Sequence, residues 1–234
     1  MSIIKKLKDP EFATLFIFHL IFVIILIVNF PTGKFFIGWD ALNPEFNLAL
    51  NFKRVFSAFW QENQGLGLLG GHGFAAVLPH NLITLFLSIF LPLEAIRPAF
   101  TFLSLYFGGL GMYLLSKLLL VRVIEEVENI PKSMAYFGAL LASLFYMLNL
   151  GTLQMFYIQL EAFVFHFMAL PWLLLITIKT LQAPNRKNLL FFFLINFFAT
   201  GQGFIPPLFV AYMFALTIFL LLIIFCKRFS ISIV

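Results

Sequence analysis

Long apolar runs separated by short polar segments dominate the hydrophobic pattern of this chain. A helix that crosses the roughly 30 Å hydrocarbon core of a bilayer needs about 20 such residues. Six runs are candidates, the fifth being short: residues 12–30, 99–120, 134–150, 162–178, 189–199 and 208–225. Pro98 precedes the second run, at a position where a helix start tolerates proline. The pattern predicts an all-α membrane protein with about six transmembrane helices, forming one polytopic domain over residues 1–234.

A shorter apolar segment decides the topology. Residues 82–91 lie between Pro79 and Pro92, and about a dozen helical residues span only about 20 Å, too little for the hydrocarbon core. If this segment does not cross and the N-terminus is cytoplasmic, eleven Lys and Arg residues lie inside and four outside. A crossing would reverse that split. The positive-inside rule therefore favours a juxtamembrane helix on the outer surface of the plasma (inner) membrane, with a cytoplasmic N-terminus.

Composition supports the membrane class. Apolar residues make up 62% of the chain and charged residues only 11%, against roughly a quarter charged in ordinary soluble domains. No basic stripe with interleaved aromatics is present, which excludes a nucleic-acid partner. The single cysteine, Cys226, excludes an internal disulfide framework.

The first outer loop, residues 31–97, carries a second type of helix. Asn43, Pro44 and Glu45 form a typical helix start, with a capping side chain, a tolerated proline and an acid near the positive end of the dipole. Apolar residues then follow at helical spacing, which predicts an amphipathic helix with its apolar face on the membrane: Leu48, Phe52, Val55, Phe56 and Phe59. With the segment at 82–91, the loop is expected to hold two juxtamembrane interfacial helices.

Two carboxylates are candidates for chemistry. Asp40 is expected at the membrane–water boundary, where it could bind a divalent cation or accept a proton from an attacking hydroxyl, or simply be a solvated loop residue. Glu161 lies in an otherwise apolar sequence at the outer end of the fourth crossing, and such carboxylates are rare and often functional. The alternative is an interfacial Glu that reaches water. Glu45 is explained by its place at the helix start, and a ligand role for it is the weaker reading.

Other polar residues on the outer side are candidates for binding. Lys53 and Arg54 could pair with a lipid phosphate, although a solvated polar face is the default interpretation. The glycine-rich turn at residues 61–73 contains His72 and is not a P-loop, because it lacks the Lys-Ser/Thr ending. His72 and His80 have no zinc-like spacing. His166 is expected to be a hydrogen-bonded packing residue.

This layout resembles the N-terminal part of the GT-C membrane glycosyltransferases. The sequences FIGWD at residues 36–40 and WQENQGLG at residues 60–67 are similar to those of large bacterial members related to arabinofuranosyltransferases and to YfhO-type proteins. The resemblance implies a pentosyl- or hexosyltransferase of the cell envelope, which moves a sugar from a polyprenyl-phosphate donor to an acceptor hydroxyl at the extracytoplasmic face.

The resemblance also assigns site residues. Asp40 matches the catalytic acid of the first outer loop, and Glu161 falls where family members more often carry Asp or an Asp pair. These two are the expected ligands of any divalent cation, Mg²⁺ or Mn²⁺. Lys53, Arg54, His72 and Glu45 are expected to bind substrate. Asp40 and Glu161 are expected to face one outward-opening groove.

Two other classes of function stay open. A transporter or flippase of a lipid-linked substrate would carry ionisable residues near the mid-bilayer and broken helices in matched halves. A noncatalytic membrane subunit or fragment would only bind a partner. Family members are usually far longer, so the chain is expected to be an N-terminal fragment that lacks a C-terminal region or a partner subunit.

Overall fold

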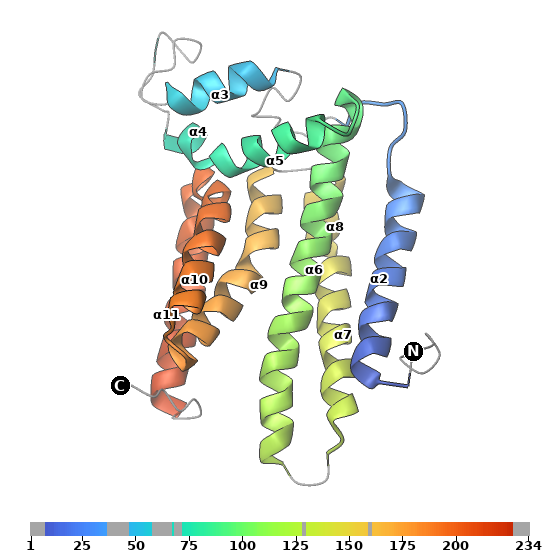
Figure 1. Ribbon diagram of the computed structural model, residues 1–234, viewed down its shortest axis with the longest axis vertical. Coiled ribbons are helices and arrows are strands. Elements are labelled where there is room, and N and C mark those ends of the chain that lie inside the picture. The colour runs from blue at the N-terminus through green and yellow to red at the C-terminus, as the bar shows by residue number, and fades with distance from the viewer. Residues whose placement is uncertain are drawn as a thin grey trace.

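The computed structural model describes residues 8–36, 47–57, 67, 72–127, 130–158 and 161–226. All regular structure in these residues is helical, as predicted. Figure 1 shows a bundle of long helices with three short helices across one end. The bundle helices are α2 (Pro10–Asn29), α6 (Leu93–Glu126), α7 (Lys132–Leu148), α8 (Leu150–Tyr157), α9 (Glu161–Gln182), α10 (Arg186–Phe198) and α11 (Pro206–Cys226). We call the end that carries α3, α4 and α5 the capped end, and the other the open end.

The lengths of these helices identify an all-α membrane protein. Helices α2, α6 and α9 are each long and apolar enough to cross a bilayer, and the bent pair α7 and α8 would make a fourth crossing. Helix α10 has 13 residues, in line with the short fifth run. In α11, the residues whose side chains are described, Pro206–Leu222, make up a shorter apolar helix. All six predicted runs are therefore helical.

Helix α6 begins earlier than the sequence suggested. Its first residue is Leu93, directly after Pro92, and Pro98 lies inside the helix. The prediction that Pro98 opens this helix is wrong, because the preceding apolar residues continue the helix and pack at the capped end. Ile96 and Phe100 are both buried there.

A second difference concerns residues 151–161, which lie between the predicted helical runs 134–150 and 162–178 and so outside any predicted helix. Residues 150–157 form α8, which is bent by 46° from α7. The bend lies at Asn149, whose backbone is extended and whose side-chain oxygen accepts a hydrogen bond from the Thr152 N–H at 3.0 Å. Asn149 thus ends one helix and caps the next, a dual role that an apolar pattern does not reveal.

Three short helices cover the capped end: α3 (Leu48–Phe56), α4 (His72–Ala76) and α5 (Leu78–Ser88). Helix α5 covers residues 82–88 of the segment predicted not to cross, and it runs across the bundle rather than along it (Figure 1). Helix α3 begins after the capping residue Asn47, whereas the predicted start at Asn43, Pro44 and Glu45 lies outside the described residues.

Helix α3 packs on α4 and α5 through a mixed face. Asn51 and Val55 are buried, while Phe56, expected on the same apolar face as Val55, is 73% exposed. The expected single apolar face is therefore divided between packing onto α5 and the outer surface.

Glycine residues of α6 set the packing of the bundle. A Cβ atom at Gly108, Gly109 or Gly111 would clash with a side chain of a neighbouring helix. These side chains are Phe167, Met147 and Trp172, respectively. Small residues allow membrane helices to approach closely. Helix α6 therefore lies at the centre of contacts with α7 and α9, and with Phe18 of α2.

Candidate functional site

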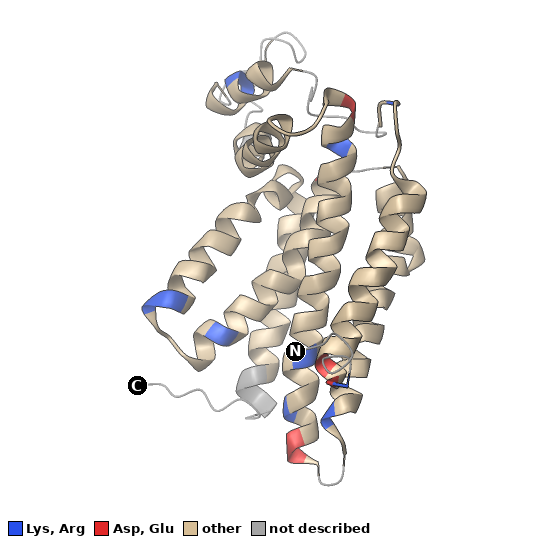
Figure 2. Cartoon of the chain, turned by 45° about the vertical axis from the view of Figure 1, so that its right-hand side comes forward, with Lys and Arg blue, Asp and Glu red and all other residues tan. Residues whose placement is uncertain are grey.

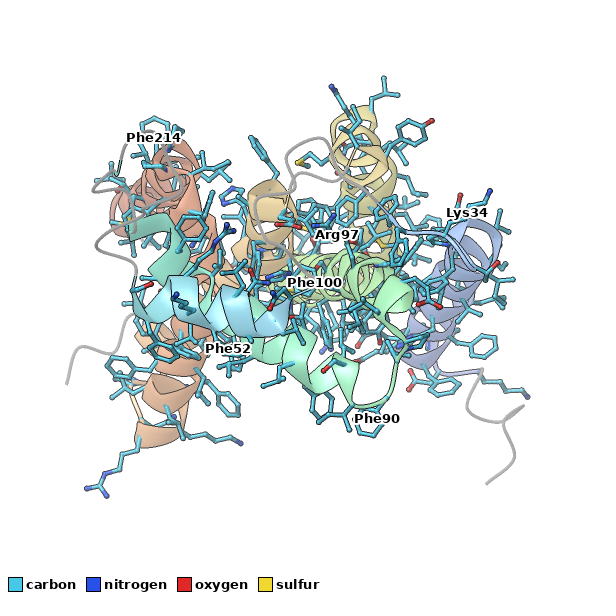
Figure 3. All side chains as sticks on the ribbon, turned by 90° about the horizontal axis from the view of Figure 1, so that it is seen from above. Lys34, Phe52, Phe90, Arg97, Phe100 and Phe214 are labelled. Carbon is cyan, nitrogen blue, oxygen red and sulfur yellow. The ribbon has the colours of Figure 1, made fainter. Side chains whose placement is uncertain are left out.

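A buried ion pair joins α6 to α9 at the capped end. The Arg97 Nη2 atom donates to Glu161 Oε1 at 2.8 Å, and each side chain is only 6% exposed. Seen from the capped end, Arg97 and Phe100 lie in the middle of the molecule (Figure 3). A buried charge is costly unless paired, so the carboxylate that the sequence singled out has the partner it needs.

Arg97 also binds the chain that leaves α2. Its Nη1 atom donates to the Phe36 backbone oxygen at 3.2 Å. The planar guanidinium can make both bonds because it presents its N–H groups in a fixed fork. One side chain thus holds α9 and the start of the first loop against the beginning of α6.

His80 of α5 is buried beside this pair. Its ring meets the ring of Phe100 edge-on, with the centroids 4.5 Å apart, and that of Phe165 at 5.5 Å. These phenylalanines lie one turn along α6 and α9 from Arg97 and Glu161. Burial lowers the pKa of His80, and Arg97 adds to this, while Glu161 and Asn81 oppose it. Burial therefore favours the neutral imidazole, which packs against Phe100 and Phe165.

A pocket of about 330 Å³ lies beside the ion pair. Phe36 and Thr101 line it on the side of the pair, and Asn29, Leu153, Phe156 and Tyr157 complete much of its wall. The Thr101 hydroxyl donates to the Arg97 backbone oxygen at 2.8 Å. The volume of the pocket is at the lower end of the range for small-molecule sites. The pocket wall is mostly apolar with a few polar groups.

The other predicted carboxylates cannot be placed against this geometry. Asp40 and Glu45 lie outside the described residues. His72 starts α4, and its side chain also lies outside the description. The convergence of Asp40 and Glu161 on one groove stays a prediction, while Phe36, four residues before Asp40, is bound directly to the partner of Glu161.

The two basic residues of α3 lie on a different part of the capped end. The Arg54 guanidinium carbon is 5.6 Å from the centre of the Phe74 ring in α4, and Lys53 is exposed. Both belong to the last turn of α3.

The described residues do not form a metal centre. Within the described ranges no three His, Cys, Asp or Glu side chains gather at a distance suited to an ion, and the Glu161 carboxylate already accepts from Arg97. His166, by contrast, is a hydrogen-bonded packing residue as expected, with its Nδ1 2.9 Å from Gln202 Oε1.

Arg97 is one of the four basic residues predicted on the outer side, and its pairing with Glu161 was not predicted. The available signal was its position: a lone basic residue directly before Pro98, at the edge of an apolar run. Two isolated opposite charges at the same end of two membrane helices predict a pair, because neither is stable alone in a low-dielectric environment.

The likeness to GT-C glycosyltransferases rests on the short motifs at residues 36–40 and 60–67 and on the arrangement of loops. Most of both motifs lies outside the described residues. A scan against protein-family models, a search of curated proteins and a search of solved structures each returned no match.

Proposed function

We propose that the capped end faces out of the cytoplasm. Figure 2 shows the charged residues gathered toward the two ends of the bundle. Four described basic residues lie toward the capped end: Lys34, Lys53, Arg54 and Arg97. Seven lie toward the open end: Lys8, Lys117, Arg122, Lys132, Lys179, Arg186 and Lys187. The positive-inside rule assigns the richer end to the cytoplasm.

Topology reporters test this orientation. A reporter fused after Asn188 should be cytoplasmic, and one inserted near Gly71 should be external. The opposite pair of signals would place the capped end in the cytoplasm.

We further propose that the capped end transfers a sugar from a polyprenyl-phosphate donor to an acceptor hydroxyl, with Asp40 as the general base. The observation that supports this is the double role of Arg97, which binds both Glu161 and the Phe36 carbonyl oxygen. Asp40 lies four positions after Phe36, a reach of at most about 14 Å. The ion pair thereby fixes Phe36, which lines the 330 Å³ pocket, and the proposal requires Asp40 to act within that reach of it.

In this proposal the two carboxylates have different tasks. Asp40 accepts the proton of the acceptor hydroxyl, whose oxygen forms a bond to the anomeric carbon of the sugar. The bond from that carbon to the donor phosphate oxygen breaks, and the lipid phosphate leaves with the electron pair. Glu161 is a positioning residue, since its carboxylate accepts from Arg97 and holds it in place. The transfer needs positioning most, because the donor supplies a good leaving group.

Sugar transfer in membrane vesicles tests the proposal. Vesicles containing the protein receive a panel of polyprenyl-phosphate-linked pentoses and hexoses, and transfer to an acceptor is measured. Asp40→Asn should abolish transfer with unchanged membrane insertion. Asp9→Asn is the matched control, because Asp9 caps α2 at the open end and asparagine caps equally well.

Two outcomes would contradict the proposal. Wild-type transfer by the Asp40→Asn variant would remove Asp40 from the mechanism. Movement of the donor across the vesicle membrane without any transfer would show a flippase instead.

A further inference from the structure

A second, larger cavity lies at the capped end on the side of α10 and α11. Its volume is about 630 Å³, within the range of ligand sites. Its lining includes Ala75, Ala76, Leu78, Gly203 and Phe209, and it shares no lining residue with the pocket beside Arg97. The wall is mostly apolar, so water is a poor occupant.

The helices that border this cavity face outward. Helix α10 buries none of its side chains, and Phe193 and Phe214 are exposed on α10 and α11. In a membrane protein such surfaces meet hydrocarbon chains. Phe209 and Asn196, on α11 and α10, line the cavity, so it lies beside helices that meet the bilayer.

Contacts between α4 and the 3₁₀-helix η1 (Thr200–Phe204) shape the upper rim of the cavity. The Thr200 hydroxyl donates to the Ala76 backbone oxygen at 3.0 Å. The rings of Phe74 and Phe204 meet edge-on with their centroids 5.8 Å apart. This rim fixes α4, and with it Phe74, above the tops of α10 and α11.

A positive charge lies directly over that rim. Arg54 rests on the Phe74 ring, with the neighbouring Lys53 exposed. Neither residue has an acidic partner in the part of the chain that the structure describes. A guanidinium over an aromatic ring still presents its edge N–H groups, which suit a phosphate.

We propose that this cavity binds an anionic membrane phospholipid, with an acyl chain between α4, α10 and α11 and the phosphate at Arg54. Basic pockets beside membrane helices are suited to such headgroups. An acyl chain gains little on moving from the bilayer into an equally apolar cavity. The acyl chain therefore fixes the position of the lipid, and the charge at Arg54 provides the affinity. This site is separate from the proposed sugar transfer and does not depend on it.

Native mass spectrometry of the purified full chain tests the site. The protein is released from detergent in the presence of dioleoyl phosphatidylglycerol or dioleoyl phosphatidylcholine, which differ in net charge but not in their chains. The wild type should retain one phosphatidylglycerol, with a preference over phosphatidylcholine of about tenfold, the size expected of a charge-assisted hydrogen bond. Arg54→Gln should reduce that preference to below about threefold.

Matched variants separate charge from shape. Lys34→Gln also removes an exposed cation from the capped end, but Lys34 lies on the side away from α11 (Figure 3), so this variant should keep the preference. Ala75→Trp fills the cavity from an exposed position and should lower retention of both lipids. Leu141→Trp adds an exposed indole on α7 and should lower neither.

Several results would overturn the proposal. These are equal retention of the two lipids by the wild type, an unchanged preference in Arg54→Gln, and undiminished retention in Ala75→Trp. Displacement of the lipid by millimolar glycerol 3-phosphate would show a site for a free phosphate ester. A mass of two chains without lipid would show that a second copy covers the cavity.

Discussion

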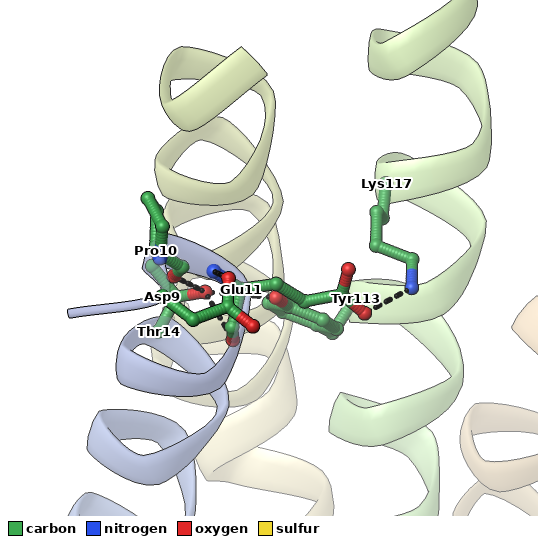
Figure 4. Close-up of polar contacts among 6 residues, drawn as sticks. All are labelled: Asp9, Pro10, Glu11, Thr14, Tyr113 and Lys117. Carbon is green, nitrogen blue, oxygen red and sulfur yellow. Dashed lines mark hydrogen bonds and ion pairs between the residues drawn. The ribbon is translucent and has the colours of Figure 1, made fainter. Parts of the chain in front are cut away.

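Two ion pairs of helix α6, Arg97 with Glu161 and Lys117 with Glu11, lie toward opposite ends of the bundle and differ most in their burial. At the capped end Arg97 and Glu161 are both buried and 2.8 Å apart. At the open end Lys117 Nζ is 2.7 Å from Glu11 Oε1, with side chains 27% and 36% exposed. Figure 4 shows that the second pair lies beside a hydrogen bond between Thr14 and Tyr113. The distances are almost equal, so burial decides what each pair is worth.

The difference in burial predicts a different effect of each pair on stability. An exposed pair gains little, because water and salt screen the attraction. A buried pair is costly to form but also costly to break, because breaking it leaves one charge alone in a poor solvent. The protein accepts that cost at the end where Arg97 also binds the first loop. At the open end a neutral hydrogen bond and buried apolar side chains suffice to hold α2 to α6.

The comparison is tested most strongly by Glu161→Gln. This change preserves shape but leaves Arg97 buried without its anion, so we expect the free energy of unfolding to fall by about 3–5 kcal/mol. Denaturant unfolding in detergent measures it. The double variant Arg97→Met with Glu161→Leu should recover most of the loss. A loss below about 1 kcal/mol for the single variant would show that the pair is solvated.

His80 gives the capped end a pH dependence. Burial lowers its pKa below 6.5, so the unfolded state binds a proton before the folded state does. Stability should therefore fall as the pH drops below about 6.5, by at most about 1.4 kcal/mol per pH unit. His80→Phe keeps an aromatic ring between Phe100 and Phe165 and should remove this part of the slope. Equal slopes for the two proteins, measured by melting between pH 5 and pH 7, would contradict it.

At the open end the neutral bond should matter more than the ion pair. Tyr113→Phe removes the hydroxyl that lies 2.8 Å from Thr14 Oγ1, and Thr14 retains its bond to the Pro10 carbonyl oxygen. We expect a loss of about 1 kcal/mol, the worth of one hydrogen bond with no polar group left unsatisfied. The same unfolding assay measures it, and a loss as large as that of Glu161→Gln would remove the contrast between the ends.

The smallest effect is expected from Lys117→Gln. Its partner Glu11 is partly exposed, so the loss should be between about 0 and 1 kcal/mol and should shrink as salt is raised. Melting curves at low and high ionic strength measure it. A larger loss of unfolding free energy that does not depend on salt would mean that the ion pair at the open end is as shielded from water as the pair at the capped end.

The apolar pattern predicted which residues form the bundle because the bilayer imposes the same length on each crossing. It also assigned α5 to the surface, since ten apolar residues between prolines are too short to span. Local signals failed at Pro98 and Asn149. Proline in the sixth position of a helix and asparagine between two helices are both permitted by sequence, and only packing selects the outcome.

The candidate site was predicted less completely. Glu161 stood out because a carboxylate in an apolar run requires an explanation. Its partner Arg97 is 64 positions away. The pairing depends on how α6 and α9 pack, which the sequence alone does not show. The role of Phe36 has no sequence signal at all, because Arg97 binds its backbone oxygen rather than its side chain.

The glycines of α6 have a mechanical consequence. Phe167, Met147 and Trp172 occupy the places of three absent side chains, and the Trp172 indole also donates to the Phe107 backbone oxygen at 2.8 Å. Turning α6 by one residue would bring Phe107 against the Phe167 ring or Leu110 against the Trp172 ring. This close packing opposes rotation of α6 relative to α7 and α9. Helices α10 and α11 contain no glycine with a contact of this kind, so they lack this restraint on rotation.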